Sequence, residues 1–499
     1  MSKKRTVLVI GGGLGGLSAA ITLKQEGFDV SLYEKNDHLG GKLNRHEQDG
    51  FGFDLGPSLL TMPYIFERLF SRSGKNMDDY VEIGEVPLQW RAFFTDGTHI
   101  DLYGDLDRMA RENPQLSGRD MAEYRKFLSY AGKIDHLTLP GYFEKGFDDV
   151  RSIIGFHGPL TALRGFDYFS TMQQGINRRV SHPHMRDMLG YFIKYVGSSA
   201  YRAPAVLNMM AHMQHETGVW YVKGGLHKLA AGIAQLACDI GVDVHISQSI
   251  KTVVTEGTGR IQHIVLADGS RRSADYIVSN MEVLPFYRHV LDYPPQNLKK
   301  LEDRFEPASS GLVLHIGVDR TYPQLGHHSF FFSKDSKQNY REVFDEKVLP
   351  SDPTIYLVNT NKTDSSQAPP GHENLKILPH IPPLQGKEYT KTDYLAFRET
   401  VLDKLENMGL VGLREHIVSE YMLTPHDIES LYFSDHGAIY GTVSDRKKNK
   451  GFKHPKKAKH IDNLYFVGGT VNPGGGMPMV TLSGQQVGAM IADRERSGK

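Results

Sequence analysis

The first residues whose spacing indicates chemistry are glycines near the start of the chain. Within the stretch VLVIGGGLGGLSAA, Gly11, Gly13 and Gly16 fill a G-x-G-x-x-G frame. In this frame the first glycine permits a tight turn, the second lets the backbone approach a pyrophosphate, and the third lets a helix pack closely on a strand. The helix then presents its N-terminal amides to the phosphates. The predicted pyrophosphate site consists of Gly11, Gly12, Gly13, Leu14, Gly15 and Gly16.

The elements around this turn must position it. Residues 6–10 form an apolar β-branched run that predicts a buried parallel strand, residues 14–26 predict a helix, and residues 29–33 predict a second strand. That strand ends in Glu34, followed by Lys35. A carboxylate at this strand end can accept hydrogen bonds from a ribose diol. A lone glycine motif also occurs in turns that bind nothing, but these elements in this order predict a dinucleotide-binding βαβ unit.

Two further glycine-rich segments accompany this unit. The glycine pair at 40–41 precedes the basic Lys42, and the segment GFGFDLGPS follows. Near the other end of the chain, NLYFVGGTVNPGGGMPMVTLSGQQV predicts a strand at 464–467, a turn at 468–469 and a helix from about Met479. A nicotinamide-binding unit does not require such segments, so they indicate a different dinucleotide.

These motifs resemble the carotenoid desaturase and oxygenase family of FAD-dependent oxidoreductases, which belongs with the flavin-containing amine oxidases. Segments that carry the resemblance, such as DLGPSLLTMP, VWYVKGGLHKLA and GTVNPGGGMPMVTLSGQQV, extend over nearly the whole chain. The resemblance implies FAD as the cofactor and an α/β fold, in which a Rossmann-like FAD-binding domain is interleaved with a mixed-sheet substrate domain and a helical membrane-facing region. Relatives have an aspartate after the second glycine pair, where this chain has Thr470, so that ribityl contact stays unassigned. The further cofactor contacts that it implies are Lys42 with the pyrophosphate, Val253 with the adenine, and Gly468, Gly469 and Met479 with the ribityl chain and flavin.

Within this family the chain is most similar to the branch that acts on thirty-carbon carotenoids. This implies oxidation of the terminal methyl group of 4,4'-diaponeurosporene or diapolycopene to an aldehyde, with O2 or water as the source of the oxygen atom. Desaturases of the family tend to have GTHPGAGIPGV at the C-terminal turn and to lack the pair His327 and His328 in LGHHSFFF. These histidines are candidates for contact with the reacting end of the substrate; an ordinary structural role for them stays open.

Three alternatives share the same motifs. A carotenoid desaturase would remove two hydrogens and add no oxygen, and a cis–trans isomerase would use reduced flavin with no net oxidant. Lipid escort proteins of this fold have lost FAD, and the complete glycine set with Glu34 argues against that class.

The amino-acid composition excludes few classes of function. Lys plus Arg and Asp plus Glu both number 58, so net charge gives no indication of a nucleic-acid partner. No spacing of His, Cys or acidic residues indicates a metal site. The single Cys238 is expected to be buried on a helix over 226–240, and the sequence shows neither a signal peptide nor an apolar run long enough for a spanning helix.

The order of the motifs predicts interleaved domains. Residues 1–75, 216–289 and 456–499 are expected to form the FAD-binding domain, 76–215 a helical substrate- and membrane-facing region, and 290–455 the substrate domain.

Two segments bear on substrate and location. Met209, Met210 and Met213, with aromatic neighbours, fit either a tunnel for a long polyene or an ordinary helix core. The basic segment SDRKKNKGFKHPKKAKH, residues 444–460, fits either a solvated face or attachment to an anionic leaflet. Together with a carotenoid substrate, it predicts peripheral association with the cytoplasmic face of the cell membrane.

Overall fold

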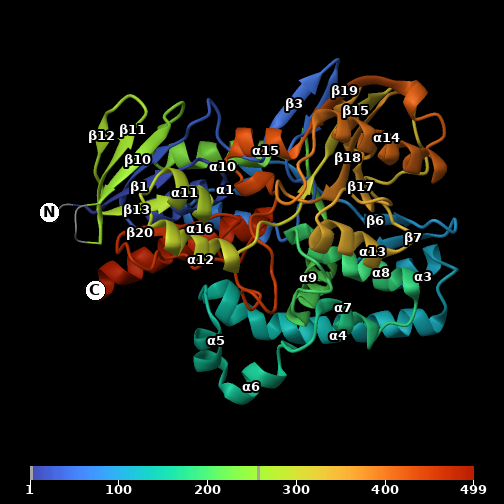
Figure 1. Cartoon of the computed structure of the whole chain (residues 1–499), viewed down its shortest axis with the longest axis horizontal. Helices are drawn as coiled ribbons and strands as arrows, with labels where there is room; N and C mark the ends of the chain where they lie inside the picture. Colours follow the sequence, from blue (N-terminus) through green and yellow to red (C-terminus); the bar gives the residue numbers. More distant parts are fainter. Residues whose placement is uncertain (1–3, 256–258, 499) are drawn as a thin grey trace.

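The chain divides into two lobes and a layer of helices in the computed structural model, which describes residues 4–255 and 259–498. Figure 1 shows a nucleotide lobe on the left, which holds both ends of the chain, and a sheet lobe on the right. The helical layer lies beneath the sheet lobe, and two short helices, α5 and α6, project below it.

A parallel sheet forms the centre of the nucleotide lobe. Its order is β20-β13-β1-β2-β9, so strands from the start, middle and end of the chain lie side by side. Buried apolar clusters cover both faces, which explains why its strands are apolar without alternation. The strands are β1 (Thr6–Ile10), β2 (Asp29–Tyr33), β9 (Asp243–His245), β13 (Tyr276–Ser279) and β20 (Leu464–Phe466). The predicted strands at 6–10 and 29–33 are confirmed.

Helices on both faces and a small antiparallel sheet complete this lobe. Helix α1 packs closely on α16, because a Cβ on Gly484 of α16 would lie 2.5 Å from the carbonyl oxygen of Gly15. The helices are α1 (Leu14–Gln25), α10 (His227–Asp239) and α16 (Met477–Ser497). The small sheet has the order β10-β11-β12 and is flanked by α11 (Val283–His289) and α12 (Pro295–Arg304). Its strands are β10 (Ile250–Thr255), β11 (Ile261–Leu266) and β12 (Arg271–Arg272).

The sheet lobe contains a larger sheet of mixed direction. Its order is β19-β15-β18-β17-β16-β6-β7, with β16 and β6 parallel and the other neighbours antiparallel. The strands are β6 (Leu88–Phe93), β7 (His99–Tyr103), β15 (Val313–Val318), β16 (His328–Phe331), β17 (Ile355–Val358), β18 (Glu373–Ile381) and β19 (Ile417–Leu423). Helix α14 (Lys391–Asn407) covers one face, and the helical layer packs on the other. The predicted mixed-sheet α/β fold is therefore confirmed.

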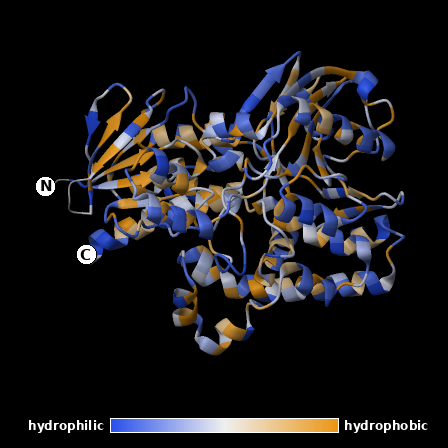
Figure 2. Cartoon of the chain, in the orientation of Figure 1, coloured by the Kyte–Doolittle hydropathy of each residue, from blue (hydrophilic) through white to orange (hydrophobic). Residues whose placement is uncertain are grey.

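The helical layer is built around α4 (Gly118–Thr138), which begins with a capping box formed by Ser117 and Asp120. The other helices are α5 (Val150–His157), α6 (Pro159–Arg164), α7 (Met172–Asn177), α8 (Pro183–Tyr191) and α9 (Met209–Thr217). In the part of the chain that the structure describes, none of the helices combines the length and hydropathy needed to cross a bilayer. Figure 2 shows apolar residues in the strands of both lobes and also on the projecting α5 and α6.

The structure corrects one sequence expectation and leaves another open. The expectation that Cys238 is buried is wrong, because its side chain lies on the exposed face of α10, next to the buried Leu236 and Ala237. The division into three domains stays a proposal.

Candidate active site

An elongated cavity of about 580 Å³ is lined by both lobes and by the helical layer. One end lies at the carboxyl edge of the parallel sheet, where β1 and β2 end. The other end is formed by aromatic and methionine side chains of the helical layer and by the large sheet. Crevices at the carboxyl ends of parallel strands are where α/β folds bind nucleotides.

The glycine turn forms the part of the wall between β1 and α1. A Cβ on Gly13 or Gly15 would lie 2.7 or 2.6 Å from the Asn280 side chain, and one on Gly16 would lie 2.0 Å from the carbonyl oxygen of Gly11. Helix α1 has no side chain capping its first amides and no acidic residue in its first turn. Gly13, Leu14 and Gly15 line the cavity. The turn therefore offers close backbone approach and uncapped amides to a pyrophosphate.

Glu34 is held at the end of β2 by backbone groups. Its Oε2 accepts a hydrogen bond from the Gly12 amide at 2.7 Å, and its Oε1 accepts one from the Asn36 amide at 2.8 Å. The side chain is buried and lines the cavity. Each carboxylate oxygen keeps a second acceptor site, so Glu34 can receive the hydroxyl groups of a ribose. Lys35 also lines this end, with its Nζ donating to the Leu431 carbonyl oxygen.

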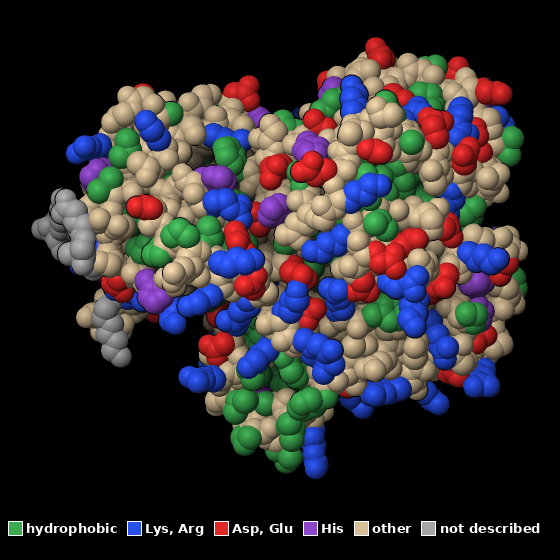
Figure 3. Space-filling view, viewed as in Figure 1, with side chains coloured by type: hydrophobic (Ala, Val, Ile, Leu, Met, Phe, Trp, Pro, Cys, Tyr) green, Lys and Arg blue, Asp and Glu red, His purple; other side chains and the backbone are tan. Residues whose placement is uncertain are grey.

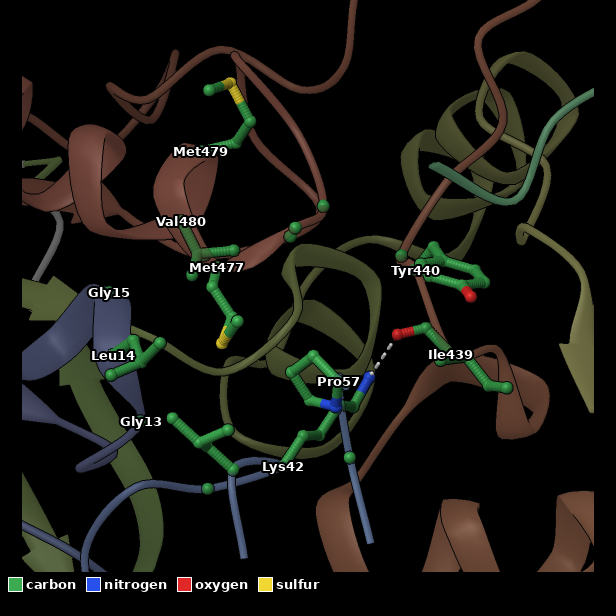
Figure 4. Close-up of a pocket in the computed structure, with 18 of the residues that line it drawn as sticks. Gly13, Leu14, Gly15, Lys42, Pro57, Ile439, Tyr440, Met477, Met479 and Val480 are labelled. Atoms are coloured by element: carbon green, nitrogen blue, oxygen red, sulfur yellow. Dashed lines mark hydrogen bonds between the residues drawn. The ribbon is translucent and has the colours of Figure 1, made fainter. Parts of the chain in front are cut away.

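Lys42 follows the glycine pair 40–41, which packs directly on Gly13 of the glycine turn. Its Nζ donates to the Ile439 carbonyl oxygen at 3.0 Å and to the Ala438 carbonyl oxygen at 3.3 Å, and it lies 3.4 Å from Oε1 of Glu282. Figure 4 shows its side chain between Gly13 and Ile439. Burial raises the pKa of the Glu282 carboxyl, and the Lys42 charge opposes this shift. Lys42 therefore joins the two lobes at the middle of the cavity.

The C-terminal turn forms another part of the wall. Gly468, Gly469 and Met479 all line the cavity. The helix begins at Met477, two residues before the predicted start, and Gly476 at its N-terminus has no side-chain cap. Met477 projects toward Leu14 and the glycine turn (Figure 4). Uncapped amides of α16 thus face the same cavity as those of α1.

Sequence reasoning missed several residues of the nucleotide end. Asn280 follows β13, and its side chain lies against Gly11, Gly13, Gly15 and Gly468. Its position directly after a buried strand was the available signal. Further along the cavity, the wall near the small sheet is formed by Gln248, Ser249 and Ile250.

Val253 lies three residues beyond Ile250, outside that wall. Its amide donates to the Val290 carbonyl oxygen at 3.1 Å, and its side chain packs in the buried cluster of the small sheet. The predicted contact between Val253 and an adenine stays a prediction, while Ile250 and Val290 are its neighbours that line the cavity.

The far end of the cavity is apolar and aromatic. Met209, Met210 and Met213 of α9 all line it, as the tunnel interpretation of these residues requires. The other residues of this wall include Tyr142, Phe143, Tyr191, Tyr195, Val196, Leu207, Val313, Tyr356, Val358, Leu378, Leu423 and Tyr440. Long rigid apolar ligands bind in such environments.

The tyrosines and the histidine at this end are held in uncharged forms, while Lys376 keeps its charge at neutral pH. Burial raises the pKa of Tyr356 and of Tyr440 and lowers the pKa of His380 well below its usual value. His380 Nε2 lies 3.3 Å from the Tyr440 hydroxyl. Burial lowers the pKa of Lys376 to about 8, although the Asp54 charge opposes the shift, and its Nζ donates to Ser58 Oγ at 3.0 Å.

His327 and His328 lie behind this wall rather than in it. The Tyr356 hydroxyl lies 2.8 Å from Nδ1 of His328, and Tyr356 is the residue that lines the cavity. His327 Nδ1 lies 2.6 Å from Oγ1 of Thr363. In the described part of the chain, the Nε2 atoms of both histidines are buried without a hydrogen-bond partner. Direct contact of either histidine with a substrate stays a prediction.

The burial of His327 predicts a loss of stability in acid. Burial lowers its pKa from 6.5 to about 4, while the charges of Asp54 and Asp364 act in the opposite direction. Between these pH values the unfolded chain binds more protons than the folded chain, so stability present above pH 6.5 is lost as the pH falls to 4. We expect a loss on the order of 3 kcal/mol from this residue. Urea unfolding at both pH values measures it; an equal loss in a His327→Gln variant would contradict the assignment.

Comparison with known proteins places the chain in a family. Residues 14–491 match the family described as flavin containing amine oxidoreductase. A relative named 4,4'-diaponeurosporene oxygenase, from Staphylococcus haemolyticus (strain JCSC1435), is 60% identical over 491 residues, which cover 98% of this chain and 97% of that protein. The protein of the same name from Staphylococcus aureus (strain USA300) is 57% identical over 493 residues, 99% of each chain. A solved structure of putrescine oxidase bound to putrescine shares the fold, with a TM-score of 0.63 at 14% identity over 99% of this chain and 100% of that chain.

The cavity fits the cofactor of this family. Added Cβ atoms on Gly13 and Gly15 would clash with Asn280, so the glycines keep the turn open for close backbone approach, and the uncapped amides of α1 suit a pyrophosphate. Glu34 retains acceptor sites for a ribose, and α16 presents a second helix N-terminus, which suits the flavin end. FAD is the cofactor. The chain therefore belongs to the flavin containing amine oxidoreductase family and is an FAD-dependent oxidoreductase.

Proposed function

We propose that the protein oxidises the terminal methyl group of a C30 carotenoid, 4,4'-diaponeurosporene or diapolycopene, to an aldehyde. The observation that carries this proposal is the continuity of one cavity from the glycine turn to an apolar wall of aromatic and methionine side chains. Such a cavity allows one end of a long hydrocarbon to meet the flavin. The names of the relatives that are 57–60% identical over nearly the full length support the same reaction.

Charge favours a hydrocarbon over an amine as the substrate. Among the described residues that line the cavity, the carboxylates are Glu34 and Glu282. Glu34 lies at the nucleotide end, and Glu282 pairs with Lys42. The apolar end therefore offers no carboxylate to an ammonium group, and burying an unpaired cation there would be costly.

The chemistry divides between the cofactor and the protein. When bound, FAD supplies a two-electron acceptor for a hydride from the substrate carbon. Loss of a hydride from the terminal methyl group would leave a cation spread over many carbons, so no strong base is needed at this step. Where water supplies the oxygen atom, it would add to this carbon and lose a proton to give the alcohol. Loss of a second hydride and a proton would then give the aldehyde, with O2 as the final electron acceptor. The apolar wall has two tasks: it places the end of the substrate and excludes bulk water. How far the polyene enters the cavity then decides which carbon reacts.

Tyr356 is the polar residue best placed to orient the substrate end. It lines the cavity from β17, an inner strand of the large sheet, and its hydroxyl is hydrogen-bonded to Nδ1 of His328. Burial keeps the phenol protonated by raising its pKa. We assign His328 the role of a positioning residue that acts through Tyr356, and His327 packs against it with ring centroids 4.3 Å apart.

Product analysis tests this function. Purified holoprotein is incubated with diaponeurosporene in liposomes under ¹⁸O₂, and in parallel in H₂¹⁸O, and the products are identified by mass spectrometry. We expect a terminal aldehyde, and its label tells whether O2 or water supplies the oxygen atom once exchange of the aldehyde with water is controlled. A product two hydrogens lighter that contains no oxygen would make the protein a desaturase and overturn the proposal.

The location of the protein in the cell is part of the same proposal. A C30 carotenoid dissolves in a bilayer, so we propose peripheral association with the cytoplasmic face of the cell membrane. The basic segment 444–460 contributes less than its composition indicates. Lys453 and Lys456 are buried, and Lys448 and Lys457 pair with Glu306 and Asp462. A membrane-binding surface of the protein is therefore expected elsewhere in the fold.

A further inference from the structure

Helices α5 and α6 form a projecting pair, which we call the apolar hairpin (residues 150–164). Gly158, with φ of 78°, ends α5 and precedes α6, so the chain reverses between them. Neither helix contains a single buried residue. Figure 1 shows the hairpin below the rest of the molecule, at the end of the helical layer.

The side chains that the hairpin exposes are large and apolar. Ile154 and Phe156 are each 40% exposed, Leu160 63% and Leu163 54%, and Phe169 just after the hairpin is 63% exposed. Figure 3 shows apolar side chains gathered at the lower tip of the molecule, where Figure 1 places α5 and α6. Contiguous exposed apolar surface of this kind marks an interaction site.

Positive charge surrounds this tip. Arg151 and Arg164 are exposed, and neither forms an ion pair with any residue that the structure describes. The Lys145 ammonium group lies 4.6 Å from the centroid of the Phe156 ring. Of the neighbouring acids, Asp149 caps α5 and Asp148 pairs with Lys456, while Glu144 is exposed beside Lys145. Apolar side chains bordered by unpaired cations match the surface of an anionic bilayer.

The hairpin is joined directly to the wall of the cavity. The helical turn η2 (Leu139–Glu144) precedes it, and Tyr142 and Phe143 of this turn line the cavity. Phe147, between η2 and α5, contacts Phe156 of the hairpin with ring centroids 5.4 Å apart. Any surface to which the hairpin binds would therefore lie close to the apolar end of the cavity.

We propose that the apolar hairpin inserts its tip into an anionic lipid bilayer and holds the apolar end of the cavity at the membrane surface. The part concerning substrate entry rests on the proposed carotenoid oxidation; the docking itself rests on the hairpin alone. The hairpin lies in the interface without crossing the membrane, because its two helices are too short to span one.

Vesicle binding of the full-length holoprotein tests the docking. The probes are vesicles of phosphatidylcholine with and without phosphatidylglycerol, and binding is measured by co-sedimentation. We expect the triple variant Leu160→Ser, Leu163→Ser, Phe169→Ser to lose affinity roughly tenfold or more. The matched control carries three substitutions at exposed apolar residues of the sheet lobe: Leu395→Ser, Val411→Ser and Val418→Ser. We expect this control to bind vesicles as the wild-type protein does.

A second variant tests the role of charge. Arg151→Glu with Arg164→Glu is expected to weaken binding to phosphatidylglycerol vesicles about tenfold or more and to leave binding to pure phosphatidylcholine vesicles unchanged. Wild-type affinity of the triple serine variant, or an equal loss in the sheet-lobe control, would overturn the proposal. So would loss of self-association in the triple variant with unchanged vesicle binding, because a second copy would then cover the hairpin.

Activity separates this inference from the proposed function. The triple serine variant is expected to oxidise diaponeurosporene in detergent micelles at the wild-type rate and diaponeurosporene in vesicles at least tenfold more slowly. Equal rates in vesicles would overturn docking as the route of substrate entry. If the wild-type protein binds vesicles through the hairpin and oxidises no carotenoid in either medium, the proposed function fails and the docking stands.

Discussion

Gly16→Ala is expected to weaken FAD binding roughly 100-fold. The added Cβ would lie 2.0 Å from the carbonyl oxygen of Gly11, which is backbone and cannot rotate away. Either α1 shifts along its axis or the turn opens, and both move the amides of Gly13 and Leu14 away from the pyrophosphate. Overpacking of this severity costs about 3 kcal/mol, which corresponds to a factor of about 100 in affinity. Flavin absorbance of the dialysed protein and titration of the apoprotein with FAD measure the change.

A matched substitution separates this effect from the general cost of replacing a helical glycine. Gly118 also lies in the first turn of a helix, and a Cβ there would meet nothing within 4 Å. Gly118→Ala is therefore expected to bind FAD as the wild-type protein does. Full flavin content in Gly16→Ala would contradict the assignment of the glycine turn to the cofactor.

Met210→Trp is expected to lower kcat/KM for the carotenoid roughly 100-fold while FAD binding is retained. Met210 lies on α9, is only partly buried, and lines the apolar end of the cavity. An indole ring there narrows a passage that a rigid conjugated chain cannot bend around, and overpacking of about 3 kcal/mol corresponds to this factor. Steady-state rates, flavin content and the thermal unfolding midpoint are measured together.

Met210→Leu is the control, because it nearly conserves the volume of the side chain. Its kcat/KM is expected to stay within about tenfold of the wild-type value. A wild-type rate in Met210→Trp with intact flavin content would show that the substrate lies elsewhere. Loss of flavin in the tryptophan variant alone would show that the two ends of the cavity are not separate.

The nucleotide half of the site was predictable from the sequence because local rules fix it. A tight turn, a close helix–strand contact and a strand-end acid each require particular residue types at short spacing, as in Gly11, Gly16 and Glu34. Asn280 could not be predicted in the same way. It reaches the glycines only because β13 pairs with β1, and these two strands are far apart in the sequence.

The substrate half depends on tertiary packing, so the sequence left it open. Periodicity could not tell a cavity wall from a core at Met209 and Met210, because both environments are apolar. Composition likewise suggested a uniform basic surface around Lys453, which is buried and donates to the Thr442 carbonyl oxygen. In sequence, α5 and α6 look like ordinary amphipathic helices whose apolar residues would be buried. Only the fold shows that no part of the described chain covers these apolar residues.

The central claim is that bound FAD oxidises the carotenoid directly, and an anaerobic single turnover tests it. Oxidised holoprotein is mixed with diaponeurosporene in the absence of O2 while the flavin absorbance is followed, and the carotenoid is then extracted and identified. The account predicts bleaching of the flavin in step with loss of the substrate, one flavin per two electrons removed. Flavin that stays oxidised in the presence of bound carotenoid, with the substrate recovered unchanged, would contradict it.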